Sequence, residues 1–370
     1  MNTALSKQRL LTELQSSGIR LTSTDTQHVS RRGGAGPSDH QAVTIDGTTI
    51  MVPVYTHSAR DSDFTIESDK GALLKKSIPI SVVGFSQTPR FYALSTAEGI
   101  PYSHIATLHS KDVLATTVLQ TCIRYESRRK ACKFCSIGQS LDAGRTVARK
   151  TPEQLAEVAR AAVELDGIKH MVMTTGTPIG PARGADVLCD SAKAIKAAVN
   201  IPIQAQCEPP ADYGWFEKMK LAGIDSLGMH LEVITPELRQ KLMPGKAEVS
   251  LDTYYEAFEV AVEVFGRGQV STYILAGLGD TQEVLVETAG KLIDLGVYPF
   301  VVPFVPIHGT PLEDHPPPSA DFMESVLGPI ASMLQQANML SADIKAGCGR
   351  CGACSSLSSY ERAETVSNQL

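Results

Sequence analysis

Two groups of cysteines dominate the chemistry that this sequence could perform. The chain has 370 residues and eight cysteines, and six of these cysteines fall into two short segments. The first group contains Cys122, Cys132 and Cys135, and the second contains Cys348, Cys351 and Cys354. In a reducing compartment, such clustering favours metal or iron–sulfur ligation over a disulfide framework.

The first group follows an apolar run and precedes a helix. Three thiolates can bind three irons of a cubane [4Fe–4S] cluster and leave the fourth iron open to a small ligand. Phe134, between Cys132 and Cys135, could shield such a cluster and stack on an aromatic ligand. The alternatives are ordinary core cysteines or a zinc site, although no fourth zinc ligand lies nearby in the sequence. We also expect the basic residues of this loop to lower the thiol pKa values: Arg124, Arg128, Arg129, Lys130 and Lys133.

Composition and charge restrict the class of protein. Hydrophobic residues make up 43% of the chain, which is ordinary for a globular protein, and the formal net charge is −6. No apolar run is long enough to span a bilayer, and the N-terminus has the pattern of a short amphipathic helix rather than of a signal peptide. We therefore expect a cytoplasmic protein without a membrane partner. The acidic balance and the absence of a basic tail argue against a nucleic-acid partner.

The chain divides into three predicted parts: an N-terminal α+β appendage over 1–110, a barrel over 111–340 and a C-terminal cysteine-rich segment over 341–370. The first part has β-strand candidates at 42–54, 77–85 and 90–96, the first of them split by an Asp-Gly turn. The C-terminal part is expected to hold an auxiliary cluster.

From residue 113 the pattern alternates between strands and helices. Apolar strands are predicted at 113–121, 169–175, 201–207, 226–233, 269–277 and 299–307. Helices are predicted from Pro152 onward, at 185–199, 213–222 and 251–265, around 285–293, and at 320–337. Nearly continuous apolar strands are typical of a parallel sheet that is covered on both faces. The pattern therefore predicts an α/β fold with a partial (β/α)6 barrel, whose active residues gather at the C-terminal strand ends.

The loop Cys-Lys-Phe-Cys-Ser-Ile-Gly, which starts at Cys132 after the first barrel strand, resembles that of radical S-adenosylmethionine (radical SAM) enzymes. The likeness covers about 113–345 and is closest to the biotin synthase and lipoyl synthase branch. The whole set of motifs closely resembles the radical SAM protein of bacterial nitrilase gene clusters. One departure is the nine residues between Cys122 and Cys132, where the family usually has three. A longer loop can still reach the same iron, because the cost of loop closure rises slowly with length.

The resemblance implies where S-adenosylmethionine binds. It places 174–177 at the methionine amino group, 230–232 at the ribose hydroxyls and 277–280 near the adenine, and the segment 306–312 resembles the family's Gly-Thr-Pro-Leu stretch. The residues expected to contact the cofactor are Phe134, Thr174, Thr175, Gly176, Thr177, Glu208, His230, Glu232, Gly277 and Gly279.

The resemblance also implies a reaction. One electron from the cluster cleaves the sulfonium bond of S-adenosylmethionine, and the resulting 5′-deoxyadenosyl radical removes a hydrogen atom from substrate. We expect a small, nitrogen-containing metabolite as substrate and a low-potential electron donor such as flavodoxin or ferredoxin. The alternatives are a non-catalytic iron–sulfur redox or electron-transfer protein and an RNA-modifying methylthiotransferase. The barrel with its cofactor motifs argues against the former, and the acidic balance argues against the latter.

The second cysteine group lies in the glycine-rich segment 347–354 and resembles the auxiliary cluster motifs of radical enzymes. Glycines let the chain wrap tightly, and successive backbone N–H groups can point at sulfides. Three ligands leave an open iron unless Cys189, Cys207 or a nearby residue completes the set. A second [4Fe–4S] cluster could bind substrate, carry electrons or donate sulfur. The alternative is a zinc-binding knuckle in a disordered tail.

Two residues beside the predicted third strand have both a functional and a structural interpretation. Glu208 could bind S-adenosylmethionine or substrate, or it could pair with a neighbouring arginine. Cys207 could face the barrel cavity or be a buried structural cysteine, and we expect the second. Arg183, in the loop after the second strand, could hold the methionine carboxylate or could be a solvated loop residue.

Several histidines and one glycine-rich loop also stay open. His308 could contact substrate or bond to its own loop. The loop over 33–40 could fold over the barrel mouth as a lid or could be an ordinary flexible loop. His104 and His109, just before the first barrel strand, are expected to be structural.

Overall fold

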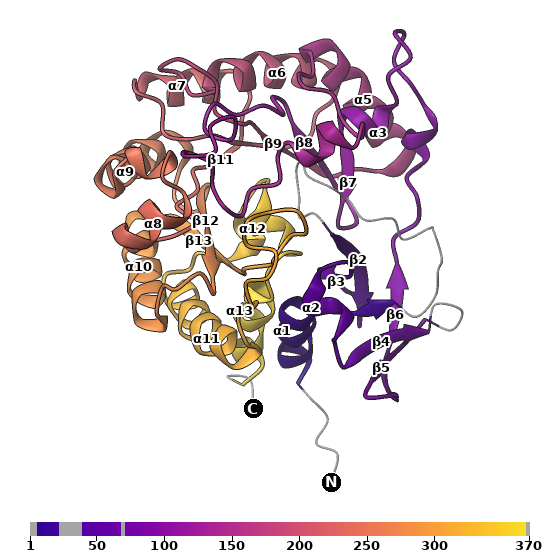
Figure 1. Cartoon of the computed structure of the whole chain (residues 1–370). Helices are drawn as coiled ribbons and strands as arrows, with labels where there is room; N and C mark the ends of the chain where they lie inside the picture. Colours follow the sequence, from indigo (N-terminus) through magenta and orange to yellow (C-terminus); the bar gives the residue numbers. More distant parts are fainter. Residues whose placement is uncertain (1–5, 22–38, 68–70, 368–370) are drawn as a thin grey trace.

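The computed structural model describes residues 6–21, 39–67 and 71–367, and a seven-stranded sheet forms its centre (Figure 1). The strands are β7 (Thr107–His109), β8 (Val113–Thr117), β9 (His170–Thr174), β10 (Ile203–Gln206), β11 (Ser226–Gly228), β12 (Val270–Ala276) and β13 (Val297–Pro303). They lie in the order β13-β12-β11-β10-β9-β8-β7. All pairs from β8 to β13 are parallel, and β7 pairs antiparallel to β8 at one edge. The predicted six-stranded parallel partial barrel is therefore confirmed.

Helices cover the outside of this sheet (Figure 1). They are α5 (Pro152–Asp166), α6 (Ala185–Ala198), α7 (Gly214–Leu221), α8 (Pro236–Leu242), α9 (Leu251–Phe265), α10 (Gln282–Leu295) and α11 (Ala320–Gln336). The start of α5 shows why the sequence folds this way: Thr151 and Gln154 form a capping box before an apolar stripe. The buried residues of that stripe are Leu155, Val158, Ala159 and Ala162.

A second, smaller sheet comes from the N-terminal part of the chain. Its strands are β1 (Arg20–Leu21), β2 (His40–Ile45), β3 (Thr48–Pro53), β4 (Phe64–Glu67), β5 (Ala72–Lys75) and β6 (Ile78–Phe85). They lie in the order β1-β4-β5-β6-β2-β3. Asp46 and Gly47 form the predicted turn of the β2–β3 hairpin, with φ values of 47° and 76°. The β-rich character of this part is confirmed, whereas the domain boundaries near 110 and 340 stay predictions.

The prediction of a strand at 90–96 is wrong. Arg90–Ala93 form a 3₁₀ turn, η2, instead. The backbone N–H groups of Arg90 and Phe91 donate to the carboxylate of Asp166, at 2.8 and 3.0 Å. Because the acceptor is the last residue of α5, the segment turns toward that helix and buries Phe91. The local sequence pattern cannot predict a contact with so distant a residue.

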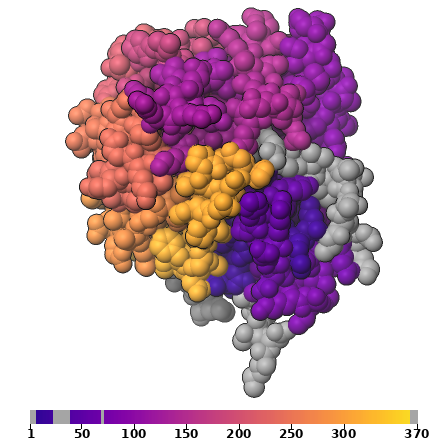
Figure 2. All heavy atoms as spheres, in the orientation of Figure 1, coloured from indigo at the N-terminus to yellow at the C-terminus, as the bar shows by residue number. Residues whose placement is uncertain are grey.

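The C-terminal segment lies between the two sheets (Figures 1 and 2). It contains α12 (Cys348–Cys351) and α13 (Leu357–Ser367). The carbonyl oxygen of Ala353 accepts from the backbone N–H of Met51 at 2.8 Å and from Nε2 of Gln15 at 2.9 Å. Gln15 belongs to α1 (Lys7–Ser17), so the N-terminal part holds the second cysteine segment in place. Among the described residues, no helix combines the length and apolar character needed to cross a membrane.

Candidate active site

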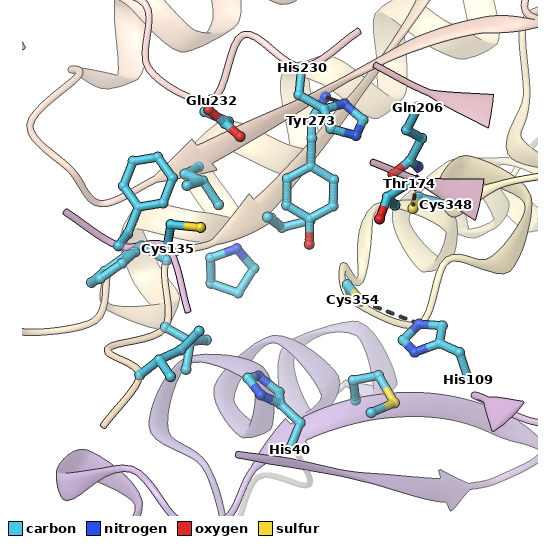
Figure 3. Close-up of a pocket in the computed structure, with 18 of the residues that line it drawn as sticks. His40, His109, Cys135, Thr174, Gln206, His230, Glu232, Tyr273, Cys348 and Cys354 are labelled. Atoms are coloured by element: carbon cyan, nitrogen blue, oxygen red, sulfur yellow. Dashed lines mark hydrogen bonds between the residues drawn. The ribbon is translucent and has the colours of Figure 1, made fainter. Parts of the chain in front are cut away.

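Both cysteine groups border one cavity of about 340 Å³ inside the barrel sheet. Cys135 of the first group lies on one side, and Cys348 and Cys354 of the second group lie on the other (Figure 3). The side chain of Tyr273, from β12, lies between them in the same view. The other polar residues of the wall are Gln15, His40, His109, Thr174, Gln206, His230 and Glu232.

The long loop after β8 folds back on itself, which brings Cys122 toward the other two thiols. The backbone N–H of Glu126 donates to the carbonyl of Cys122 at 3.1 Å, and that of Lys130 donates to Ser127 at 2.8 Å. Burial raises the pKa values of Cys132 and Cys135, and the nearby Cys122 raises both further. The nine-residue spacing is therefore absorbed by turns, and the three cysteines form one group.

The basic residues of this loop were expected to offset the charge of a cluster, which stays a prediction, and to lower the thiol pKa values. The prediction that they lower the thiol pKa values is wrong for Cys132 and Cys135. Burial is the largest effect there, and it raises the pKa of Cys135 to about 12. The nearby cation that lowers both values is Lys246, from η3 (Lys246–Glu248), outside the loop. Lys130 instead pairs with Glu248 at 2.6 Å and helps to fasten the loop to the barrel.

Arg124 fastens the loop from inside. Its Nε and Nη2 atoms donate to the two carboxylate oxygens of Glu208, at 2.8 and 2.7 Å, and it also donates to the carbonyl of Gly245. Thr177 donates to the same carboxylate at 2.9 Å. Burial alone would raise the pKa of Glu208, but the bonds from Arg124 and the charge of Lys246 lower it below the ordinary value. The interpretation of Glu208 as the partner of an arginine is thus the one that the structure shows, and its contact with the cofactor stays a prediction.

Gly176 brings the end of β9 against the cysteine loop. A Cβ atom at this position would lie 2.1 Å from the carbonyl oxygen of Thr121 and 3.0 Å from Cβ of Cys122. Backbone bonds join the two segments, from Gly176 N–H to Leu119 at 2.9 Å and from Ile123 N–H to Thr177 at 3.0 Å. Only glycine permits this approach, so the segment 174–177 positions Cys122 directly.

The other members of this segment differ in where their hydroxyl groups point. Thr174 borders the cavity, and its Oγ1 lies 2.8 Å from that of Thr117. The hydroxyl of Thr175 donates to the carbonyl of Gly176 at 2.8 Å. Both hydroxyls therefore order the segment, and cofactor contact by 174–177 stays a prediction.

His230 and Glu232 lie together after β11, and both border the cavity (Figure 3). Nδ1 of His230 accepts from the backbone N–H of Tyr273 at 3.2 Å, so the ring proton of the neutral imidazole lies on Nε2. Burial, with a smaller effect of Lys246, lowers the pKa of His230 to about 3. Glu232 has a φ of 63°, and its carboxylate lies 2.9 Å from Nζ of Lys246. A non-glycine residue whose backbone is held in the left-handed region, next to a buried ion pair, is typical of a functional site.

Phe134 borders the cavity, whereas the two glycines after β12 shape its surroundings. Phe134 packs beside Cys132 in a small apolar cluster. Gly277 and Gly279 have φ values of 104° and 114°, in the left-handed region that favours glycine. The next residue, Asp280, accepts from the N–H groups of Ile234 and Thr235, at 2.8 and 2.9 Å, and so links this turn to the start of α8. Contact of the glycines with the adenine stays a prediction.

Each cysteine of the second group has a polar side chain beside its sulfur. Gln206 donates from Nε2 to Sγ of Cys348 at 3.2 Å, and the hydroxyl of Ser110 bonds to Cys351. Sγ of Cys354 lies 3.6 Å from Nε2 of His109. Burial and the nearby Cys354 raise the pKa of Tyr273. The second group is therefore ordered by residues of the barrel sheet.

Cys189 and Cys207 belong to the apolar core of the barrel. Successive residues of a strand point to opposite faces. Because Gln206 borders the cavity, Cys207, the residue after β10, is directed toward the helix layer, where its near neighbour Cys189 lies on α6. The expectation of a buried Cys207 agrees with its exposed fraction of 8%.

The remaining candidates lie nearer the barrel rim. His308 pairs with Glu313 of its own loop at 3.0 Å, and its side chain is half exposed. Nη1 of Arg183 lies 3.9 Å from the Glu208 carboxylate and, within the part of the chain that the structure describes, has no hydrogen-bond partner. Of the proposed lid, 33–38 lie outside the described residues. Asp39 accepts from the backbone N–H of His308 at 3.3 Å.

Sequence reasoning missed Tyr273, Gln206 and the role of His109. The signal for the first two was present, because each is a polar residue on a predicted barrel strand, and alternate residues of such a strand point into the barrel. His109 lies on β7, an edge strand of three residues that carries no periodic signal. Its contact with Cys354 joins residues far apart in the chain, so no local pattern could predict it.

No ready-made site for a single metal ion exists among residues 6–21, 39–67 and 71–367, where no three His, Cys, Asp or Glu side chains converge on one point. In a cubane cluster each thiolate binds a different iron, so the three sulfurs do not converge in that way. The donor set of three thiols beside a buried lysine fits a negatively charged cluster at the first group. The three thiols of the second group, with their hydrogen-bonding neighbours, also fit an iron–sulfur cluster.

These features define a partial α/β barrel with a cysteine-lined reaction chamber. Residues 128–292 match the family model of the radical SAM superfamily. This part of the chain is therefore a radical SAM domain, and members of this superfamily of enzymes use a [4Fe–4S] cluster and S-adenosylmethionine. The matched region includes Cys132 and Cys135 and begins after Cys122, where the spacing departs from the usual one.

Curated relatives agree with this assignment over part of their length. The chain is 27% identical over 224 residues to bacteriochlorophyllide c C-7(1)-hydroxylase of Chlorobaculum limnaeum, covering 55% of each chain. It is 32% identical over 190 residues to the [FeFe] hydrogenase maturase subunit HydE of Thermotoga maritima, covering 50% of each. The chain thus spans about half the length of these relatives.

Solved structures include a more distant likeness. Methylornithine synthase (PylB) aligns with a TM-score of 0.45 and 18% identity, over 71% of this chain and 79% of that one. The predicted membership in the radical SAM superfamily is confirmed by the family match, and the link to nitrilase gene clusters stays a prediction.

Proposed function

We propose that this protein is a radical SAM enzyme that transforms a small molecule in the cavity between its two cysteine groups. The observation that carries the proposal is the shared wall: Cys135 borders the cavity on one side, and Cys348 and Cys354 border it on the other. A [4Fe–4S] cluster on the first group would supply the electron that cleaves S-adenosylmethionine to a hydrogen-abstracting 5′-deoxyadenosyl radical. The protein positions the reactants and excludes water.

The first group would hold its cluster through Cys122, Cys132 and Cys135. Lys246 lies near enough to lower the pKa values of Cys132 and Cys135, and the same positive charge would offset the negative charge of a thiolate-bound cluster. Gly176 keeps Cys122 in place from the neighbouring strand. These contacts support a cluster site in which Cys122 is separated from Cys132 by more residues than is usual.

S-adenosylmethionine would lie along the strand ends beside this group. Thr174 offers a hydroxyl and Phe134 an aromatic face at the cavity wall. Nη1 of Arg183 has no hydrogen-bond partner among the described residues and would suit the methionine carboxylate. His230, Glu232, Gly277 and Gly279 would serve the ribose and adenine ends.

The wall of the cavity supports a small, polar and uncharged substrate group. Gln206 offers an amide and Tyr273 a hydroxyl. Much of the remaining wall is apolar, with Met51, Val172, Leu275, Val302 and Phe304 among its residues. Amide-type hydrogen bonding in an apolar wall suits a nitrogen-containing metabolite. A low-potential donor such as flavodoxin or ferredoxin would supply the electron.

We also propose a second [4Fe–4S] cluster at Cys348, Cys351 and Cys354. The support is the set of hydrogen-bonding side chains, one at each sulfur, since bonds of this kind tune iron–sulfur clusters. The test is the iron and sulfide content, with Mössbauer spectra, of anaerobically reconstituted protein and of two triple-alanine variants, one for each cysteine group.

Two cubanes require about eight irons in the parent and about four in each variant. Equal iron in the parent and in the C-terminal variant would remove the second cluster from the proposal. Full iron in the variant of the first group would contradict the assignment of the catalytic cluster.

A further inference from the structure

We propose that His109 is the fourth protein ligand of the cluster at Cys348, Cys351 and Cys354. This inference rests on the second cluster of the proposed function. It assigns a coordination set of three cysteines and one histidine, which leaves no iron open to substrate.

His109 meets the second cysteine group at the cavity wall. Its Nε2 atom lies 3.6 Å from Sγ of Cys354, and both residues border the same cavity (Figure 3). The imidazole therefore points into the space that a cluster on these cysteines would fill. Neutral imidazole is an established iron ligand, and histidine can replace cysteine at an iron–sulfur cluster.

The backbone around His109 is held by the barrel sheet. His109 is the last residue of β7 and pairs with Val113 of β8 in the barrel sheet. The next residue, Ser110, has a φ of 57°, which a serine seldom adopts, and its hydroxyl bonds to Cys351. This one turn thus contacts two of the three cysteines, and its strained backbone is typical of a functional position.

Other thiols are poorly placed to complete the set. Three thiolates leave one iron of a cubane without a protein ligand. Cys189 and Cys207 both belong to the apolar core, and Cys207 follows a residue that faces the cavity, so it is directed to the opposite side of the sheet. His109 supplies a nitrogen donor at the cavity wall without any change in the fold.

A second cluster with four protein ligands changes how the substrate can be held in the cavity. A closed second cluster cannot anchor the substrate through an iron atom. Substrate would instead be held by the side chains between the two groups, among them Gln206, which donates to Cys348, and Tyr273, which lies near Cys354.

The test uses the full chain carrying the triple-alanine change at Cys122, Cys132 and Cys135, so that only the second cluster contributes. After anaerobic reconstitution and reduction, pulsed electron paramagnetic resonance measures nitrogen coupling to the cluster. We expect strong coupling from a coordinated nitrogen, altered when histidine carries ¹⁵N and absent in His109→Ala. His109→Cys should keep the cluster and lose that coupling.

His40→Ala is the matched control, because His40 also borders the cavity but comes from β2. It should keep the nitrogen coupling of the parent. A cluster without strong nitrogen coupling, or with coupling that survives His109→Ala, would overturn this inference alone and leave His109 as a hydrogen-bond donor to Cys354. No iron at all in this background would overturn the second cluster together with its ligand.

Discussion

Gly176 illustrates how one residue without a side chain can control a cluster site. In Gly176→Ala the new Cβ would overlap the Thr121 carbonyl, at 2.1 Å, so the backbone that carries Cys122 must move. Overpacking of this kind costs about 1–3 kcal/mol of folding stability. We expect the first cluster to lose iron and the rate of S-adenosylmethionine cleavage to fall at least about tenfold, which corresponds to about 1.4 kcal/mol in the barrier.

Gly328→Ala is the matched control for this change. Gly328 lies in α11, and a Cβ atom there would meet no atom within 4 Å. Alanine also favours the helix over glycine by about 1 kcal/mol, so stability should hold or rise. Equal iron content and cleavage rates in the two variants would show that Gly176 does not position the cysteine loop.

The Arg124–Glu208 pair predicts a pH dependence of stability. Glu208→Gln removes the buried carboxylate that Arg124 binds through two atoms and leaves the guanidinium with the more exposed Glu248, at 3.4 Å. Loss of a buried charge partner costs about 3 kcal/mol. The pKa of Glu208 is lowered in the folded protein, so its contribution is complete above the unfolded pKa of about 4.3 and is lost as pH falls through the folded value.

Urea unfolding of the apoprotein between pH 3 and pH 7 measures this contribution. The free energy of unfolding of the parent should fall more steeply in acid than that of the variant, and the gap between them should be widest at neutral pH. A constant gap across the whole range would contradict a charged Glu208 in the folded state.

At the scale of single residues, the sequence predicted the cysteine groups well but not their neighbours. Cys132 and Cys135 are close in sequence, and the motif around them is specific. Tyr273 and His109 contact Cys354 across sequence separations that no local pattern encodes. The error about thiol pKa values has the same origin, because burial of Cys135 depends on tertiary packing.

At the scale of elements, the helix α1 supports the second cysteine segment, which lies far away in the sequence. Gln15 donates to the Ala353 carbonyl, between Cys351 and Cys354. In Gln15→Ala that bond is lost, at a cost of about 1 kcal/mol, and the second cysteine segment loosens. We expect the second cluster to lose iron faster under chelation while the first cluster is unchanged.

Timed iron release to a chelator, followed by Mössbauer spectra, separates the two sites. Gln8→Ala, on the same helix at a half-buried position, is the control and should match the parent. Faster iron loss from the first cluster, or no difference between the two glutamine variants, would exclude this role for α1.

Most elements of the barrel could be predicted because each carries its own signal. The strands β8 to β13 are buried and β9 and β13 are mostly apolar, and helices such as α5 begin with a cap and continue with a stripe. The predicted strands extended into 118–121 and 229–233, past the regular ends of β8 and β11, although Glu232 still bridges to Ile274 of β12. An apolar run does not show where a regular ladder ends. The segment 90–96 failed because Asp166, far along the chain, satisfies its backbone.

At the scale of the whole molecule, the cavity belongs to no single part of the chain. Gln15, His40 and Met51 come from the N-terminal part, while Cys348 and Cys354 come from the C-terminal part. The barrel supplies the rest of the wall. The sequence predicted the N-terminal part, the barrel and the C-terminal segment separately. It could not show that all three border one cavity, because the cavity is formed by residues far apart in the sequence.

The most direct test of the account is the formation of 5′-deoxyadenosine from S-adenosylmethionine by anaerobically reconstituted, dithionite-reduced protein. The parent and the Cys348, Cys351 and Cys354 triple-alanine variant should both form it, because the first group alone carries the cleaving cluster. The Cys122, Cys132 and Cys135 triple-alanine variant should fall to the level of a protein-free control. Equal formation by that variant and the parent, or none by a parent with a full iron complement, would contradict the central claim.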